Sequence, residues 1–363
     1  MPRLPTLLLC IPLALTSAGG PVEFGRQELQ SALEERKTKP TGMRVQSELS
    51  TDPPESFRIL PGRVTGGDLR GLMYGLLEAA DQVRRKGQLA AAKGTPALQV
   101  RGVRMLVRAG QGTEDWIRSP QFWQAQFEAM ARARLNRVNL FFAGQEGLPG
   151  DVETLALISK TAAEYAVELA LGFRVKDLAQ PGAGGELSRG PSTLMALKEL
   201  LASCPSVRSV QFWLEPEDEA WQAPFCRDWL FRAIRESGRR VSLELRVSKP
   251  SSESVTVAKE AGLPLRLGMR YGESGRGAAT SLAGAEELWQ FEADGGFGGQ
   301  QLRNPVLVRR VMQECVKAKC AGMEFDAPEG GAPPDAALYR MWGRLAYDPS
   351  TPETAWRVPE ARP

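Results

Sequence analysis

Carboxylates and arginines recur at the ends of short apolar segments in this chain of 363 residues, and they are the side chains best suited to chemistry. The chain contains no histidine. This absence excludes Ser-His-Asp and Cys-His catalysis, zinc sites with histidine ligands and imidazole pH switches. Proton transfer would therefore fall to carboxylates, lysine, tyrosine or cysteine.

The order of residues within these segments predicts how the side chains are displayed. Segment 210–215 reads VQFWLE, with apolar residues at even positions and Gln, Trp and Glu at odd positions. Segments 167–174, 241–248, 265–270 and 323–326 alternate in the same way. Because neighbouring side chains of a strand point to opposite faces, each strand is apolar on one face only. A sheet covered by helices on both sides would be apolar on both faces, so the pattern favours a closed barrel with a polar lumen.

Eight segments of strand length follow residue 96, and amphipathic segments separate most of them. Strands are expected at 98–105, 137–143, 167–175, 207–215, 240–247, 264–271, 288–294 and 321–326. Helices are expected at 120–135, 151–165, 192–201, 225–237, 252–261 and 305–319. The repeat predicts an α/β protein with a (β/α)8 TIM barrel. A doubly wound open sheet has the same alternation, and only the one-sided strands argue against it.

Active sites of such barrels lie at the C-terminal ends of the strands, so the late lumen-facing residues are the candidates. Two carboxylates beside aromatic residues are what cleavage of a glycosidic bond requires. We expect Glu215 to be the general acid, with Asp294 or Asp326 as base or nucleophile. The expected substrate-binding residues are Arg104, Asn139, Arg174, Trp213, Arg246, Arg270 and Tyr271. The alternative is that arginines and glutamates merely pair inside the lumen.

Other ligands are less well matched by the sequence. Acidic residues at a barrel mouth also suit Ca²⁺ or Mg²⁺, but no EF-hand spacing occurs. The glycine-rich segment 295–299 lacks the Lys-Ser/Thr of a phosphate-binding loop and is expected to be a loop over the mouth. The net charge of +3 does not indicate nucleic acid as a partner. We therefore expect a carbohydrate substrate, no metal and no cofactor.

The N-terminus is typical of a secretory signal peptide over residues 1–18. Arg3 precedes the apolar run 7–15, and small residues follow it at 16–18. Proline at positions 5 and 12 disfavours the alternative, a buried helix. The run is too short to span a membrane in the mature chain. We expect a secreted or periplasmic protein in which four cysteines remain and disulfides are permitted: Cys204, Cys226, Cys315 and Cys320.

A small α+β domain is expected to precede the barrel, over residues 21–95. It contains a strand at 56–60, a turn at Pro61-Gly62, and a helix at 69–85 that Asp68 would cap. The barrel is then expected at 96–347, and a tail at 348–363.

Three stretches of the sequence resemble glycoside hydrolases. SFRI at 56–59 with TGGDLRGLMYGLL at 65–77 looks like the small N-terminal α/β domain of bacterial β-hexosaminidases and α-glucuronidases. RGVR at 101–104, SPQFW at 119–123 and RARLNRVNL at 132–140 resemble the start of those barrels. WGRLAYDP at 342–349 resembles a segment that follows the last strand in α-glucuronidase-like proteins.

The resemblance implies an exported enzyme that acts on a polysaccharide or its terminal sugar or uronic acid. Arginines at the mouth would suit a sugar carboxylate through bidentate pairing. The chain departs from the family at the end of the fourth strand, where Leu214-Glu215-Pro216 stands instead of an Asp-Glu pair. The competing interpretation is a catalytically inactive glycan-binding or scaffold descendant.

Overall fold

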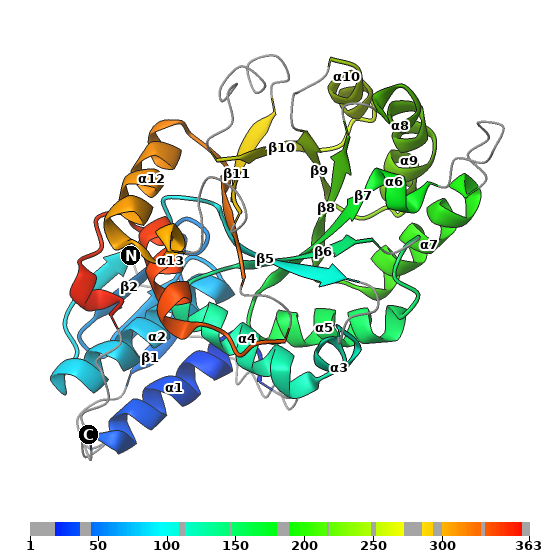
Figure 1. The fold of residues 1–363 in the computed structure, drawn as a ribbon. Coiled ribbons are helices and arrows are strands. Elements are labelled where there is room, and N and C mark those ends of the chain that lie inside the picture. The colour runs from blue at the N-terminus through cyan, green and yellow to red at the C-terminus, as the bar shows by residue number, and fades with distance from the viewer. Residues whose placement is uncertain are drawn as a thin grey trace, which may run out of the picture.

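Eight parallel strands close into a barrel in the order β10-β11-β12-β5-β6-β7-β8-β9 (Figure 1). The computed structural model describes residues 19–36, 45–108, 113–144, 147–179, 189–215, 218–247, 252–271, 285–292, 300–327 and 331–357. The barrel strands are β5 (Val100–Arg108), β6 (Arg137–Ala143), β7 (Glu168–Arg174), β8 (Val207–Leu214), β9 (Ser242–Val247), β10 (Leu265–Arg270), β11 (Glu286–Phe291) and β12 (Gly322–Asp326). The predicted (β/α)8 barrel is confirmed, and the open sheet is excluded.

Helices cover the outside of the barrel. They are α3 (Thr113–Ile117), α4 (Pro120–Ala133), α5 (Val152–Glu164), α6 (Val175–Leu178), α7 (Gly190–Ser203), α8 (Glu219–Phe225), α9 (Arg232–Glu236), α10 (Ser252–Glu260), α12 (Pro305–Lys317) and α13 (Ala336–Tyr347). The sequence marks their starts. Ser119 accepts a hydrogen bond from the Phe122 amide at 3.2 Å, and Asn304 caps α12 in the same way. Within the described ranges, no helix is both long and apolar enough to cross a membrane.

The helix predicted at 225–237 is wrong in its detail. The chain forms α8, then a π-helical segment at Cys226–Phe231, and then α9. Pro224 lies inside α8 and has no backbone N–H to donate, so the regular hydrogen-bond ladder is interrupted there. Short π-helical segments are one way in which a helix absorbs such an interruption.

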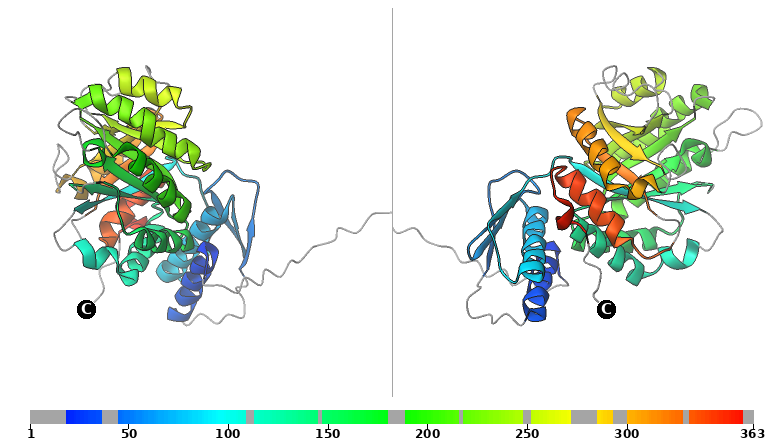
Figure 2. Two further views of the ribbon diagram at one scale, coloured as in Figure 1. Left: turned by 90° about the vertical axis from the view of Figure 1, so that its right-hand side faces the viewer. Right: turned by 60° about the vertical axis from the view of Figure 1, so that its left-hand side comes forward.

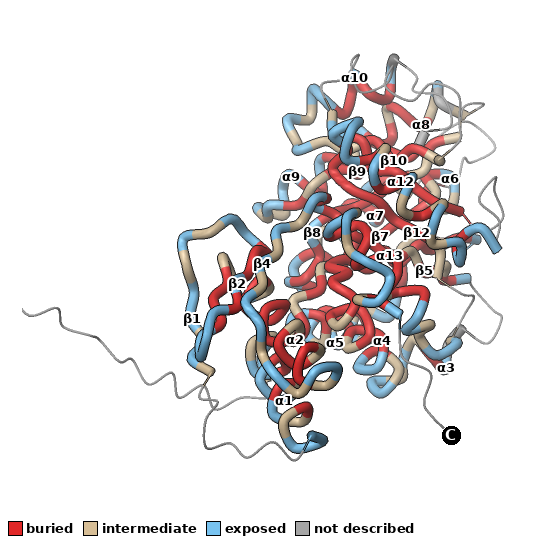
Figure 3. The backbone as a smooth tube through the Cα atoms, turned by 90° about the vertical axis from the view of Figure 1, so that its left-hand side faces the viewer, coloured by how far each residue is buried: buried red, intermediate tan, exposed pale blue. Residues whose placement is uncertain are grey.

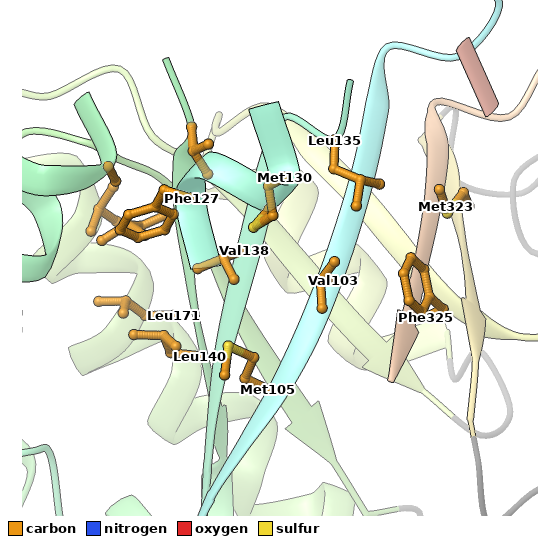
Figure 4. Close-up of a cluster of buried hydrophobic side chains, with 14 of the residues drawn as sticks. Val103, Met105, Phe127, Met130, Leu135, Val138, Leu140, Leu171, Met323 and Phe325 are labelled. Carbon is orange, nitrogen blue, oxygen red and sulfur yellow. The ribbon is translucent and has the colours of Figure 1, made fainter. Parts of the chain in front are cut away.

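The apolar faces of the strands pack against the helices, as the alternation predicts. Val103 and Met105 of β5 and Val138 of β6 are buried with Phe127 and Met130 of α4 (Figure 4). Burial runs along all of the barrel strands and into the helices around them (Figure 3). This layer holds the barrel closed and leaves the opposite strand faces to the lumen.

A second sheet precedes the barrel, in the order β1-β3-β2-β4. Its strands are β1 (Gln46–Leu49), β2 (Phe57–Leu60), β3 (Arg63–Gly66) and β4 (Ala92–Gly94), and its helices are α1 (Pro21–Glu35) and α2 (Leu69–Lys86). Asp68 caps α2 as predicted, accepting a hydrogen bond from the Gly71 amide at 2.6 Å. The two helices lie between this sheet and the barrel (Figure 2).

Ion pairs connect the small sheet and α2 to the N-terminal ends of the barrel strands. Arg70 of α2 contacts Glu55 at 2.8 Å and Glu168, the first residue of β7, at 3.1 Å. Arg101, near the start of β5, is fully buried and also pairs with Glu55. These contacts lie at the N-terminal end of the barrel. Active sites of this fold are built at the opposite end, where the strands have their C-terminal ends.

Candidate active site

Ion pairs fill the interior of the lumen, below the C-terminal ends of the strands. Arg137 of β6 forms a two-pronged contact with Glu244 of β9, and its Nε lies 2.8 Å from Oε1 of Glu324 on β12. Burial by itself would raise the pKa of Glu244, but the charge of Arg137 outweighs it and lowers that pKa. All three side chains are nearly inaccessible to solvent. For these residues the alternative expectation is correct, because the arginine and the glutamates pair and neutralise one another inside the barrel.

Asn139 belongs to this closed part of the lumen. Its amide Nδ2 donates to Glu324 at 3.1 Å and to Gln211 at 3.3 Å, and the residue is 0% exposed. The sequence predicts that it binds substrate from the second strand. The structure instead places it among polar side chains that link three strands.

At the C-terminal ends of the strands, three arginines converge on Glu292. Arg104 of β5 donates to its Oε1 at 2.9 Å, the Nε of Arg270 lies 3.0 Å from Oε2, and Arg246 of β9 contacts Oε1. Arg104 also donates to Oδ1 of Asp326, at the end of β12, at 2.7 Å. The predicted arginines of strands one, five and six therefore do meet at one site.

Glu292 is a site residue that was not expected from the sequence. The seventh strand is expected at 288–294, with Asp294 as its last lumen-facing residue, but β11 spans Glu286–Phe291. Glu292 has the same parity as Asp294 and directly follows the observed strand end, so it occupies the place that Asp294 was expected to take. Asp294 itself lies outside the described residues.

Glu215 follows β8 directly and is held at two points. Its carboxylate Oε1 lies 2.5 Å from the ammonium of Lys176 on α6, and its backbone amide donates to Oε1 of Gln222 at 2.9 Å. Gln222, on α8, is fully buried and was not among the residues expected at the site. Its position in a helix seven residues further on gives no signal in the sequence alone.

The face of Trp213 is covered by cations. The guanidinium carbon of Arg246 lies 4.0 Å from the ring centroid of Trp213, and that of Arg174 lies 4.7 Å away. Phe141 of β6 packs beside the same ring, with 5.9 Å between centroids. The Nε of Arg174 is buried and has no hydrogen-bond partner among the described residues.

Positive charge is concentrated at this end of the barrel. Burial, and then the charge of Arg104, lower the pKa of Arg246 to about 10, although Glu292 acts in the opposite direction. Burial is the largest cause of this shift, and the charges of Arg104 and Arg270 add to it. An anionic group that binds there would relieve this repulsion.

Tyr271 is placed differently from the prediction. Its hydroxyl donates to Glu314 of α12 at 3.0 Å, and its ring packs 4.9 Å from that of Phe291. The reason is the alternation of side chains, since Tyr271 follows the lumen-facing Arg270 directly and must point to the helix side. It does not join the arginines at the mouth.

Comparison with known proteins identifies the fold. No family model matches the sequence, and no curated protein matches it. Among solved structures, the chain is similar to a GH138 enzyme targeting pectin rhamnogalacturonan II, with a TM-score of 0.71 and 14% sequence identity. The alignment covers 91% of this chain and 50% of that protein, so the chain spans about half its length. At this identity the likeness concerns the fold.

Proposed function

We propose that this protein is an exported glycoside hydrolase that acts on a polysaccharide or its terminal sugar or uronic acid. The observation that carries the proposal is the position of two carboxylates. Glu215 follows β8 and Asp326 ends β12, and these strands are four apart in a barrel of eight, so they face each other across the mouth. The fold shared with a pectin-directed GH138 enzyme agrees with this activity class.

Different surroundings suggest different roles for the two carboxylates. Asp326 is paired with Arg104, which favours the anion that a base or nucleophile must be. Glu215 is the proposed general acid, and its cation partner Lys176 is an exposed side chain that an arriving sugar can displace. If the reaction inverts the sugar, the two carboxyl groups should be about 6.5–9.5 Å apart, and if it retains the configuration, about 5–5.5 Å apart.

The arginines favour a sugar that carries a carboxylate. Arg174 has an unused buried donor, and burial followed by the charge of Arg104 lowers the pKa of Arg246. A guanidinium matches a planar carboxylate with two parallel hydrogen bonds, which a neutral hydroxymethyl group does not offer. We therefore propose that the mouth binds a uronic acid residue, with Arg174 contacting its carboxylate.

The test is the Glu215→Gln variant, assayed on a panel of aryl glycosides and uronic acid-containing oligosaccharides. Gln keeps the shape but carries no titrating proton, so turnover should fall by about 10²- to 10⁴-fold while sugar binding persists. The matched control is Glu236→Gln, since Glu236 also pairs with a lysine, Lys198, at 3.0 Å, but lies on the surface. Undiminished turnover in Glu215→Gln would refute the assignment.

A second candidate function is supported by one feature of the mouth. Three described carboxylates there are already paired with a cation: Glu215 with Lys176, and both Asp326 and Glu292 with Arg104. Such pairing is also what a non-catalytic glycan-binding descendant would retain. Calorimetric affinity for a uronic acid oligosaccharide without turnover of any substrate on the panel would select this function.

Export is proposed from residues 1–18 alone. Expression of the full chain in a bacterial host, followed by mass spectrometry of the mature N-terminus, tests it. Cleavage after Ala18 and recovery from the periplasm or medium are expected. An intact N-terminus retained in the cytoplasm would contradict export.

A further inference from the structure

The end of helix α12 brings two cysteines together. Lys319 has a left-handed backbone, with φ of 56°, and its amide donates to the Val316 carbonyl at 3.0 Å. The Cys320 amide donates to the Cys315 carbonyl at 3.1 Å. These two bonds define a Schellman motif, in which the residue three positions before the helix cap commonly contacts the second residue beyond it. Here Cys315 and Cys320 occupy those two positions.

Both side chains are buried, with Cys315 0% exposed and Cys320 8% exposed. After burial, the neighbouring Cys320 thiol is one of the causes that raise the pKa of the Cys315 thiol. The Sγ of Cys315 also lies 3.9 Å from the Gly322 carbonyl, and that of Cys320 lies 3.9 Å from Oε2 of Glu287. Both are free thiols in the structure. A disulfide requires two cysteines whose Cα atoms lie within about 7 Å of each other, and in this turn the two residues are joined by one backbone hydrogen bond.

We propose that Cys315 and Cys320 form a disulfide bond when the chain folds in an oxidising compartment. The thiolate of one cysteine attacks a disulfide of an oxidoreductase or of oxidised glutathione, and the second cysteine then displaces that partner. One S–S bond forms within the chain, and the oxidant accepts two electrons and two protons to become a pair of thiols. The proposal rests on export and not on the proposed catalytic activity.

Burial places the oxidation before the final packing of α12. It raises the pKa of the Cys315 thiol, so the folded protein holds little of the reactive thiolate. Oxidation is therefore fast during folding and slow once the helix has packed. The bond then joins the end of α12 to the residues that lead into β12, the strand that ends at Asp326.

The sequence between the two cysteines suits a direct test. Lys317 and Lys319 separate them, so trypsin cuts the backbone between Cys315 and Cys320 and leaves peptides 311–317 and 320–340 joined only by the disulfide. Full-length protein is refolded from the reduced state in a glutathione redox buffer, blocked with an alkylating reagent and digested. The joined peptides, lighter by two hydrogens than their sum, are expected from wild type.

Variants separate this bond from other pairings. Cys226→Ser should retain the joined peptides, and Cys320→Ser should leave Cys315 alkylated. Native reduced protein placed in the same buffer should oxidise much more slowly than refolding protein. Recovery of both cysteines in alkylated form after refolding, or a link from either to Cys204 or Cys226, would overturn the proposal.

Discussion

Glu55 is the residue whose removal should destabilise this protein most clearly. Its carboxylate accepts hydrogen bonds from Arg70 at 2.8 Å and from Asn136 at 3.0 Å, and it also contacts Arg101. Arg101 is 0% exposed. The Glu55→Gln variant keeps the shape of the side chain but leaves this buried guanidinium without its neutralising charge.

The size of the effect follows from the charges around this carboxylate. Burial would raise the pKa of Glu55, but Arg101 and Arg70 lower it from the ordinary value of 4.5 to about 2. Each unit corresponds to about 1.4 kcal/mol, so the charge contributes roughly 3 kcal/mol. Loss of one partner from a buried ion pair costs about 3–5 kcal/mol, which agrees. The free energy of unfolding should therefore fall by about 3–5 kcal/mol at pH 7.

The pH dependence distinguishes this cause from a packing defect. Because the pKa is lower in the folded state, the stabilisation is fully present above the unfolded value of 4.5 and is lost as the pH falls through about 2. The difference between wild type and Glu55→Gln should thus be largest at neutral pH and shrink steadily toward pH 2. Urea unfolding followed by tryptophan fluorescence at several pH values measures it.

The matched control is Asp52→Asn in the same small domain. Asp52 pairs with Arg58 at 2.6 Å, but the Arg58 side chain is 59% exposed, so the expected loss is below about 1 kcal/mol. A Glu55→Gln protein within about 1 kcal/mol of wild type, or a difference independent of pH, would refute the reasoning.

Three further predictions concern the barrel. In Gly322→Ala the new Cβ would lie 2.0 Å from the Val100 carbonyl oxygen, so the melting temperature should drop, with a loss of about 1–3 kcal/mol, and an unchanged melting curve would contradict this. Gln222→Leu removes the acceptor of the Glu215 amide and should lower kcat with little change in KM or circular dichroism, whereas wild-type kcat would exclude a positioning role. Arg174→Lys loses bidentate pairing and should weaken binding of a uronic acid ligand by about 10- to 100-fold in calorimetry while sparing the neutral sugar, and equal losses for both would rule out carboxylate recognition.

The closed barrel follows from local sequence pattern. Alternation of apolar and polar residues is a local property of each strand, and five segments show the same one-sided pattern. The caps of α2 and α12 are likewise local, because Asp68 and Asn304 bond to amides only two or three residues away. Such features need no knowledge of distant parts of the chain.

The same local pattern predicted only some of the residues at the site. Parity correctly predicted that Arg246 and Arg270 face the lumen, and applied consistently it excludes Tyr271, which follows Arg270 directly. It did not locate the end of the seventh strand. That strand was expected to end at residue 294 but ends at Phe291, so Asp294 was expected at the position that Glu292 occupies. The end of a strand depends on how it pairs with neighbouring strands, and the sequence of one strand carries no information about that pairing.

Which charges meet depends on contacts between distant parts of the chain. Arg104 and Glu292 are separated by 188 residues and Glu55 and Arg101 by 46, and each pair is formed by barrel closure or by docking of the small domain. The same is true of Lys176 with Glu215, and of Trp213 beneath two guanidinium groups. Partner choice among many arginines and carboxylates of similar local sequence is set by strand register and by which faces are buried together, and those are properties of the assembled fold.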